Sequence, residues 1–545
     1  MRARASGSEP VGGDQTMTHR VSVAMSANVH AELVDHLTHR DGRKGICLAT
    51  YRPSTGATRR TAIVSEVITP LPGERAGHGT AFVTGASVLR AAAIARDRDE
   101  GLVLCHRSPA GRGWQAPSST DRDAERSFAN LARELTGVPL VGMTHAGLDD
   151  RWSARHWDRG VGAAVACTDA ENVRVVGARL TVSWNDAVVP RPDVQAAQQR
   201  SVSCWGQAVH DDLVRRSVLV VGTGSVGLEV ALRLAATGVT KIGLLDFDTV
   251  EEGNLDRMVG VTPTDVWLRR AKVDVARRLI LENATASELH LQTWDHSMCE
   301  PAGILHALDF DLIVCCVDRP WPRAVLNVLA YSDLVPVIDG GIAVDVFPDG
   351  QGMRNATWRS HVVRPGRPCM ACNGQLDLGA LAADVDGLLD DPDYVRGRER
   401  CDPAGAGHNV AVLSINVTAA LLAQYVSFNV GPGGSGEPGP LQYVLSTNTL
   451  EHLPVASGPH CLYEVTEALG DARPVLSGQH AQAEERRDER AALPLGRRGG
   501  RVVDDVVWSW RRRLASVAAR RLRSAGVATS RRAVRRPVPR GGVRR

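Results

Sequence analysis

The hydrophobic pattern divides the chain into two regions. Between residues 21 and 189, short apolar runs that suit strands stand between polar stretches, and the expected strands are 46–51, 61–68, 101–105 and 140–143. One amphipathic stretch, 118–135, predicts a helix with acidic residues in its first turn. From residue 218 onward, wholly apolar runs alternate with helical stretches, which is typical of buried parallel strands.

In the second region we expect strands at 217–221, 241–246, 312–317 and 335–338, and helices at 228–236 and 271–282. This alternation predicts an α/β fold with a Rossmann-like, doubly wound, mainly parallel sheet. A length of 545 residues also favours more than one domain. The expected units are a disordered start (1–19), an α+β domain (20–190), the Rossmann-like domain (195–472) and a largely disordered, Arg-rich tail (473–545).

The composition indicates a soluble globular protein, with 43% hydrophobic and 23% charged residues. We expect no membrane span because no uninterrupted apolar run reaches about 18 residues. The polar start lacks the apolar core of a secretory signal, so we expect a cytoplasmic protein. Eleven cysteines in such a chain favour reduced thiols or metal ligands over a disulfide framework.

Positive charge is distributed unevenly along the chain. Residues 496–545 contain 16 Arg and 2 Asp, a net charge of +14, which leaves the preceding residues at −11. A block of like charges is usually disordered, although it can bind nucleic acid or anionic membrane electrostatically. Few aromatic residues are interleaved there, so solvated disorder is our expectation, with one basic helix predicted over 502–523.

A glycine-rich loop joins the first strand and helix of the second region. The sequence 218–227, VLVVGTGSVG, matches GxGxxG in a strand–loop–helix setting. Gly222 suits the tight turn, Gly224 lets the backbone approach a phosphate, and Gly227 lets helix and strand pack closely. Asp246 ends the next strand, at the spacing expected of an acid that binds ribose. The sequence therefore predicts a nucleotide-binding site.

The residues that follow favour a nucleoside triphosphate over a dinucleotide. Asp248, Asn254 and Arg257 come soon after Asp246, and Lys272 begins the next helix in a chain with only three lysines. Asp318 ends a later strand, where a carboxylate can hold Mg²⁺. Hydride transfer has no need of such a set of cations and acids.

These motifs resemble the adenylyltransferase fold shared by ThiF, MoeB and the E1 ubiquitin-activating enzymes. The resemblance covers about residues 200–469 and rests on five motifs in family order: GTGSVG, LLDFDTVEEGNLDRM, AK, DLIVCCVDRP and PVIDGGI. It implies that ATP and Mg²⁺ are bound, and that the C-terminal carboxylate of a ubiquitin-like or sulfur-carrier protein attacks the α-phosphate. The products would be an acyl-adenylate and pyrophosphate.

The resemblance also assigns roles to single residues. Asp246 would bind the ATP ribose, Asn254, Arg257 and Lys272 the phosphates, and Asp318 the magnesium. The family forms homodimers in which an arginine before the first strand reaches the partner's ATP. Arg200 is the candidate here, in the loosely matching stretch QRSVSCWG.

Two cysteine motifs follow the predicted nucleotide site. Cys369 and Cys372 form a CxxC pair that can grip one Zn²⁺, and a structural zinc site needs four ligands. His460 and Cys461 are the candidates for the other two, with Glu464 standing where a second CxxC would end. A redox pair and a pair that has lost its metal remain alternatives.

Cys401 lies in a Gly-rich stretch beside Arg400, a setting that favours a thiolate nucleophile. In E1-like enzymes a cysteine of this region accepts the acyl group as a thioester. An ordinary, unreactive cysteine is the alternative.

The first region resembles the JAB/MPN metalloprotease family over about residues 21–180. Glu66, His106, Ser118 and Asp121 match its Glu, the first His of HxHP, and the Ser and Asp of SxxD. The resemblance implies zinc ligands at His106 and Asp121 and a general base at Glu66. Ser108 replaces the second histidine, so we expect a degenerate, binding-type domain. An active variant and an unrelated α/β domain, in which His106 is only a hydrogen-bonded residue, are the alternatives.

The main interpretation is therefore an ATP-dependent adenylyltransferase fused to a degenerate JAB-like domain. Two other functions stay open. An NAD(P)-binding Rossmann oxidoreductase would use the same glycine loop, but the set of Arg257, Lys272 and Asp318 disfavours it. A non-catalytic scaffold that binds a ubiquitin-like protein is compatible with the loose match at Arg200 and with the missing histidine.

Overall fold

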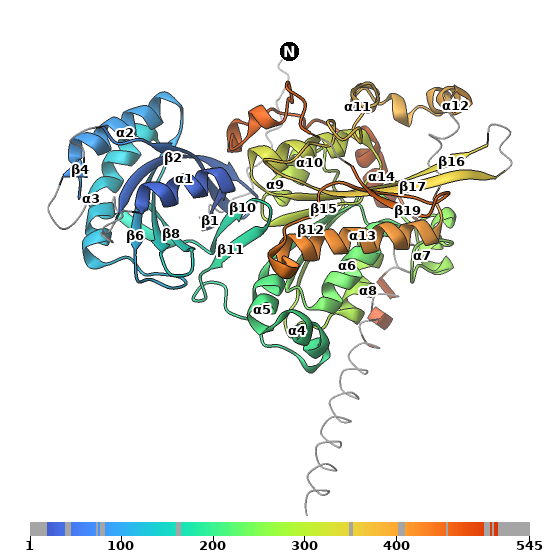
Figure 1. The fold of residues 1–545 in the computed structure, drawn as a ribbon. Helices are drawn as coiled ribbons and strands as arrows, with labels where there is room; N and C mark the ends of the chain where they lie inside the picture. The colour runs from blue at the N-terminus through green and yellow to red at the C-terminus, as the bar shows by residue number, and fades with distance from the viewer. Residues whose placement is uncertain are drawn as a thin grey trace, which may run out of the picture.

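The computed structural model describes residues 19–38, 45–71, 75–76, 82–159, 165–347, 352–401, 409–453 and 456–494, together with 497, 502–503, 506–508 and 510. Two α/β units lie side by side, each built around its own sheet (Figure 1). Cys401 ends a helix, but its side chain lies outside the described part of the chain, as does most of the basic helix predicted over 502–523.

The first unit contains a nine-stranded mixed sheet among the described residues. Across the sheet the strands are β11 (Leu180–Trp184), β10 (Asn172–Val176), β1 (Arg20–Ser26), β3 (Arg59–Ile68), β2 (Ile46–Thr55), β6 (Gly101–Ser108), β7 (Leu140–Ala146), β8 (Arg151–Arg159) and β9 (Val165–Asp169). All four strands predicted from the sequence are present. A separate short pair, β4 (Arg75–Ala76) and β5 (Phe82–Val83), lies beside it.

Helices cover both faces of this sheet. α1 (Ala27–Leu37) buries Leu33 and Leu37 on one face, and α2 (Gly85–Asp97) packs with α3 (Ser119–Thr136) on the other. The predicted amphipathic helix is α3, and the Ser118 hydroxyl accepts a hydrogen bond from the Asp121 backbone N–H at its start (3.2 Å).

The second unit contains an eight-stranded sheet whose first five strands are parallel. In order across the sheet they are β14 (His290–Trp294), β13 (Lys241–Leu245), β12 (Ser217–Val221), β15 (Leu312–Cys315) and β16 (Val337–Val346). Three antiparallel strands follow, β17 (Met353–Val363), β18 (Leu441–Val444) and β19 (Thr449–His452). The expected mainly parallel α/β sheet is confirmed.

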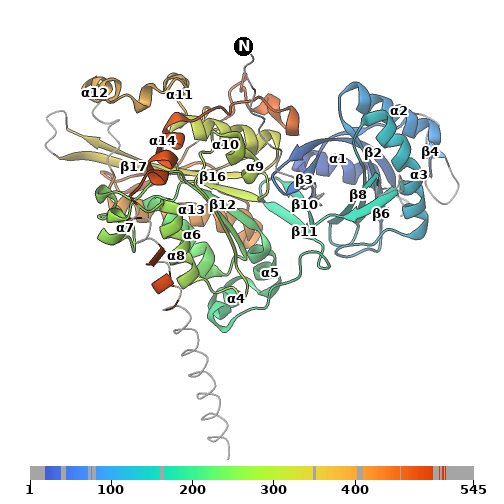
Figure 2. The same cartoon turned by 180° about the vertical axis from the view of Figure 1, so that it is seen from behind.

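Both faces of this sheet are buried, which explains the continuous apolar runs. Along β12, Val218 and Val220 face one core, while Leu219 and Val221 face the other. The first core is covered by α6 (Ser225–Thr237), α8 (Lys272–Asn283) and α13 (Ala411–Asn429), and the second by α9 (Pro301–Ala307) and α10 (Pro320–Ser332). Figure 2 shows the same layers from behind.

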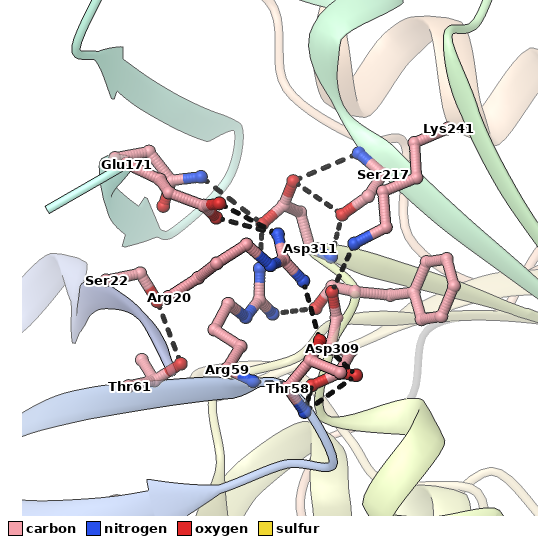
Figure 3. A network of polar contacts seen from close by, with 12 residues as sticks. Arg20, Ser22, Thr58, Arg59, Thr61, Glu171, Ser217, Lys241, Asp309 and Asp311 are labelled. Atoms are coloured by element: carbon pink, nitrogen blue, oxygen red, sulfur yellow. Dashed lines mark hydrogen bonds and ion pairs between the residues drawn. The ribbon is translucent and has the colours of Figure 1, made fainter. Parts of the chain in front are cut away.

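The two units are joined by a buried polar network (Figure 3). Arg59 of β3 donates a 2.6 Å hydrogen bond to Asp311, which also accepts one from Arg174 of β10 at 3.0 Å. Nearby, the Asp309 carboxylate accepts bonds from the Thr58 backbone and hydroxyl, at 2.9 and 2.7 Å. Burial opposes ionisation of Asp311, but Arg59 and Arg174 outweigh it and hold the pKa of Asp311 well below its usual range.

The first part of the segment after residue 472, which its composition predicts to be largely disordered, is ordered. Residues 473–494 pack on the second unit, and they include α14 (Ala481–Ala491). Arg487 pairs with Glu300 (2.5 Å), and Arg490 pairs with Asp295 (2.7 Å). Charged residues that suggest a solvated tail are therefore ordered here because carboxylates of the domain face them.

One described helix, α13, is long and apolar enough to cross a membrane by length and composition alone. Within this fold it packs against α6, β16 and β17. Its polar residues Ser414, Gln424 and Asn429 are buried and hydrogen-bonded inside the unit. These contacts account for the helix as a core element of the second unit.

Candidate functional site

The glycine loop between β12 and α6 has the geometry that its motif predicts. Gly222 has a φ of +85°, in the left-handed region that favours glycine. A Cβ on Gly227 would lie 1.8 Å from the Gly222 carbonyl oxygen, so this position requires close helix–strand packing. Gly224 has open space where a Cβ would stand and lines the cavity beside the loop. The start of α6 can therefore approach an anion.

Asp246 is fixed beside this loop at the end of β13. Its carboxylate accepts hydrogen bonds from the Thr223 backbone N–H (2.6 Å) and the Thr223 hydroxyl (3.0 Å). A third bond comes from the backbone N–H of Asp248 (2.9 Å). Burial and the neighbouring Asp248 charge raise the pKa of Asp246, although Lys272 acts against the shift. The side chain is thus held in position before any ligand binds.

Lys272 stands at the start of α8, among carboxylates. It donates a 2.7 Å hydrogen bond to Asp248, and its side chain is only 15% exposed. Burial disfavours the ammonium ion, but the charges of Asp246, Asp248 and Asp318 outweigh it and raise the pKa of Lys272. The lysine is therefore charged, and it points into the acidic rim of the cavity.

Asn254 and Arg257 line another wall of the same cavity. The Asn254 side chain accepts a hydrogen bond from the Glu251 backbone N–H (3.0 Å), which fixes the short helix η3 (Glu252–Asn254). Arg257 bonds to the Gly253 carbonyl and to Asp256. Asp318 follows β15, is exposed, and lines the same cavity.

A cavity of about 910 Å³ brings these residues together at the carboxyl ends of the parallel strands. The predicted residues that line it are Gly222, Gly224, Asp246, Asp248, Asn254, Arg257, Lys272 and Asp318. Crevices at this edge of a doubly wound sheet are where ligands bind. Arg200 does not line the cavity of its own chain; it lies on α4 (Gln199–Trp205).

The sequence analysis missed several residues of this cavity. Arg323 on α10 lines it and lies 3.6 Å from Asp339 of β16, which belongs to the PVIDGGI motif. That motif was the available signal for Asp339, whereas a single arginine in an Arg-rich chain gives none. His480 and Arg486 enter from the C-terminal segment and carried no local signal.

Three of the four predicted zinc ligands meet. One ligand atom each from Cys369, Cys372 and Cys461 lies within 4.8 Å of the others, and no other group of three potential ligands of this kind occurs among the described residues. The Gly458 backbone N–H donates to the Cys372 sulfur (3.3 Å), a contact that stabilises a thiolate. His460, the predicted fourth ligand, is exposed and is not part of this cluster. Three thiolates fit zinc, which requires one further ligand.

His106 and Asp121, the predicted zinc ligands of the first unit, lie close together, and the guanidinium group of Arg155 lies nearby. His106 Nδ1 lies 3.5 Å from Asp121, and His106 Nε2 lies 3.1 Å from Glu125. Arg155 Nε donates to the Glu125 carboxylate (2.6 Å), as does the Trp157 indole (2.6 Å). Arg155 occupies the Glu125 carboxylate, and no group of three potential metal ligands forms here among the described residues, so His106 and Asp121 alone offer too few ligands for zinc.

The predicted general base of that unit is also displaced. Glu66 lies opposite Thr50, which in turn lies opposite Leu102, four residues along β6 from His106. At about 3.3 Å per residue, this offset is about 13 Å. Glu66 pairs with Arg98 at the surface instead.

Comparison with known proteins places the second unit. Residues 196–460 match the ThiF family. The adenylyltransferase and sulfurtransferase MOCS3 of Culex quinquefasciatus is 34% identical over 24% of this chain and 28% of its own length. UBA4 of Meyerozyma guilliermondii, also an adenylyltransferase and sulfurtransferase, is 32% identical over 22% of this chain and 28% of its own length. SUMO-activating enzyme subunit 2 of Dictyostelium discoideum is 28% identical over 26% of this chain and 21% of its own length.

The chain thus spans less than a third of the length of these relatives. Among solved structures, E. coli MccB with ATP aligns at 20% identity over 50% of this chain and 74% of that chain, with a TM-score of 0.38. The glycine loop, the charged cavity at the strand ends and the family match agree on one identification. Residues 196–460 of this chain form a ThiF-family domain.

Proposed function

We propose that the second unit is an ATP-dependent adenylyltransferase that activates a carboxylate. The observation that carries this proposal is the cavity itself. Glycine-loop backbone, the ribose acid Asp246, two cations (Arg257 and Lys272) and the exposed Asp318 face one space. An NAD-dependent oxidoreductase explains the glycine loop and Asp246 but has no use for the other three.

In the proposed reaction a carboxylate oxygen attacks the α-phosphorus of ATP. The new bond joins acyl oxygen to phosphorus, the bond from the α-phosphorus to the bridging oxygen breaks, and pyrophosphate leaves with the electron pair. Arg257 and Lys272 stabilise the negative charge that accumulates on the phosphates. Asp318 is an oxygen ligand of the kind that Mg²⁺ prefers, and a bound Mg²⁺ would neutralise charge on the leaving group.

The proposed carboxylate is the C-terminal glycine of a ubiquitin-like or sulfur-carrier protein. The support is the similarity to adenylyltransferase–sulfurtransferases and to a SUMO-activating enzyme subunit. Gly340 and Gly341 also line the cavity, so part of its wall at β16 has no side chains and a chain terminus can approach the backbone there.

The test is ATP–pyrophosphate exchange with the full chain and a panel of ubiquitin-like and sulfur-carrier proteins. Exchange that requires one of these proteins and falls at least about a hundredfold in Asp318→Ala supports the proposal. The matched control is Asp393→Ala, an exposed aspartate on α12 (Pro392–Cys401) outside the cavity. Partner binding without any exchange would favour a scaffold.

We propose further that ATP is bound in a homodimer to which Arg200 contributes from the partner. The position of Arg200 outside the cavity of its own chain supports a role in trans. Mixing two inactive chains, Arg200→Ala and Lys272→Ala, should then restore part of the exchange, because a mixed dimer retains one intact site. No recovery after mixing would remove this role.

A thioester step at Cys401 is a separate proposal. The adenylate would pass its acyl group to the thiolate, with AMP as leaving group. A carrier conjugate that is cleaved by reducing agent and is lost in Cys401→Ala, while exchange persists, supports it. ATP–pyrophosphate exchange without a thioester conjugate of the carrier protein would show that the reaction stops at the acyl-adenylate.

For the first unit we propose a degenerate JAB-like module that binds its partner without hydrolysing it. The pairing of Arg155 with Glu125 beside His106 supports this, as does the displacement of Glu66. Hydrolysis of a ubiquitin-like fusion by the wild type and its loss in His106→Ala would contradict the proposal.

A further inference from the structure

His480 belongs to a segment that the family match does not include. The ThiF match ends at residue 460, and His480 immediately precedes α14. Yet His480, Gln482 and Arg486 line the same cavity as the glycine loop and Lys272. The C-terminal segment therefore supplies part of the wall of the proposed nucleotide site.

The segment is held in place at several points. The Arg490 guanidinium donates to the Phe247 carbonyl (2.6 Å) and to Asp295 (2.7 Å), and Arg487 donates to Glu300 (2.5 Å). The Gly478 backbone N–H donates to the Cys299 carbonyl (2.9 Å). These contacts attach the segment to the loops after β13 and β14, so His480 has a defined position.

His480 is packed between two aromatic rings. Its ring lies edge-on to Phe247, with centroids 5.1 Å apart, and edge-on to Trp321 at 5.4 Å. Phe247 directly follows Asp246, the expected ribose acid, and Trp321 follows Asp318 by three residues. The imidazole thus lies between the loop that follows β13 and the start of α10.

One ring nitrogen of His480 has no hydrogen-bond partner among the residues that the structure describes. The residue is 8% exposed, and its Nδ1 atom is buried without a hydrogen bond in the described structure. A buried polar atom of this kind usually has a partner, and the His480 residue lines the cavity, so the unpaired nitrogen indicates a partner that the described residues do not supply. Burial also lowers the pKa of His480, so the ring is neutral and Nδ1 can donate or accept, depending on the tautomer.

We propose that His480 hydrogen-bonds to the nucleoside part of the bound nucleotide, so that the segment after residue 460 completes the site. The inference rests on the proposed ATP site. The phosphates are assigned to the glycine loop, Arg257 and Lys272, whereas His480 packs on Phe247 beside the ribose acid. The contact is therefore to ribose or base rather than to phosphate.

The experiment measures binding of ATP and of AMP to the full chain by titration calorimetry. His480→Phe keeps an aromatic ring between Phe247 and Trp321 but removes Nδ1, and His480→Asn restores a polar atom near that position. The control is His452→Phe, an exposed histidine on β19 outside the cavity. Melting curves of each variant check folding.

We expect His480→Phe to weaken ATP and AMP binding by the same factor, about tenfold, and His480→Asn to recover most of it. Unchanged binding in His480→Phe would show that the residue only packs. A loss for ATP but not for AMP would place it at the phosphates and also overturn the inference.

Failure of the proposed function gives a different result. If the wild type binds ATP but catalyses no pyrophosphate exchange, the adenylyltransferase proposal fails, while a tenfold loss in His480→Phe still supports the nucleoside contact. If the wild type binds neither ATP nor AMP, both proposals fail.

Discussion

Arg59 of the first unit donates a 2.6 Å hydrogen bond to Asp311 of the second, and the two side chains are 1% and 2% exposed. They lie 252 residues apart in the chain. Arg174 contacts the same carboxylate at 3.0 Å, so two guanidinium groups share one buried acid. The contact between the units therefore includes buried ion pairs of Asp311 with Arg59 and Arg174, which are shielded from water.

Removing one member of this pair should destabilise the protein strongly. In Arg59→Ala, the buried Asp311 carboxylate keeps only one cationic partner, Arg174. Removing one partner of a buried ion pair lowers the free energy of unfolding by about 3–5 kcal/mol. Urea unfolding of the full chain measures the change. The control is Arg96→Ala, which removes an exposed pair with Asp97 and should cost less than about 1 kcal/mol. Equal decreases in the free energy of unfolding in both variants would show that the buried pair stabilises the protein no more than an exposed pair does.

Stability should fall as the pH drops from about 6.5 to about 4, in part because of His361. Burial lowers the pKa of His361, on β17, to about 4, against an ordinary value near 6.5. The unfolded chain therefore binds a proton in this range that the folded chain does not. The contribution of His361 is complete above pH 6.5, and up to about 3 kcal/mol is lost on reaching pH 4.

The measurement is the free energy of unfolding against pH for the wild type and His361→Gln. The variant has no imidazole to protonate, so its curve should be flatter between pH 6.5 and 4. His452→Gln, at an exposed position, should follow the wild-type slope. Parallel curves for all three proteins would exclude His361 as a source of the pH dependence.

Lys272→Arg should impair exchange although it keeps the positive charge. Lys272 fits its site as a compact ammonium group that donates to Asp248 at 2.7 Å, and a guanidinium is planar and larger. We expect a loss in kcat of at least about tenfold, and a greater loss in Lys272→Ala. Lys241→Arg is the matched substitution, because Lys241 begins β13 and lies outside the cavity. Full activity in Lys272→Arg would show that charge alone is sufficient.

The cysteine cluster should hold about one zinc ion per chain, as three thiolates at this spacing indicate. Metal analysis after gel filtration measures it. Cys461→Ser should lower the zinc content, and Cys204→Ser, an exposed thiol outside the cluster, should leave it unchanged. His460→Ala should also leave it unchanged, whereas Glu464→Gln tests whether that carboxylate is the fourth ligand. Absence of zinc from the wild type would favour a pair that has lost its metal.

The residues that line the cavity were largely predictable because most of them follow strand ends. Gly222, Asp246 and Asp318 each come directly after an apolar run, and parallel strands bring such positions to one edge. Lys272 was found through a motif and through the scarcity of lysine. Asp339 lies in a motif that had been noticed, but its role beside Arg323 depends on how α10 packs.

Other features were decided by contacts between distant segments. The sequence shows that residues 473–494 are charged, but not that Glu300 and Asp295 face their arginines. It places His106 and Asp121 in one motif, but not Arg155 beside them, and it places His460 next to Cys461 without showing that the side chain lies outside the cluster.

The amino-acid sequence by itself thus determined the fold of the second unit and which residues stand at its strand ends, because both depend on local periodicity and short spacings. The tertiary structure alone decided the buried junction at Asp311 and the entry of His480 into the cavity. Such contacts depend on which surfaces of separate segments fit and exclude water, and no local pattern encodes that fit.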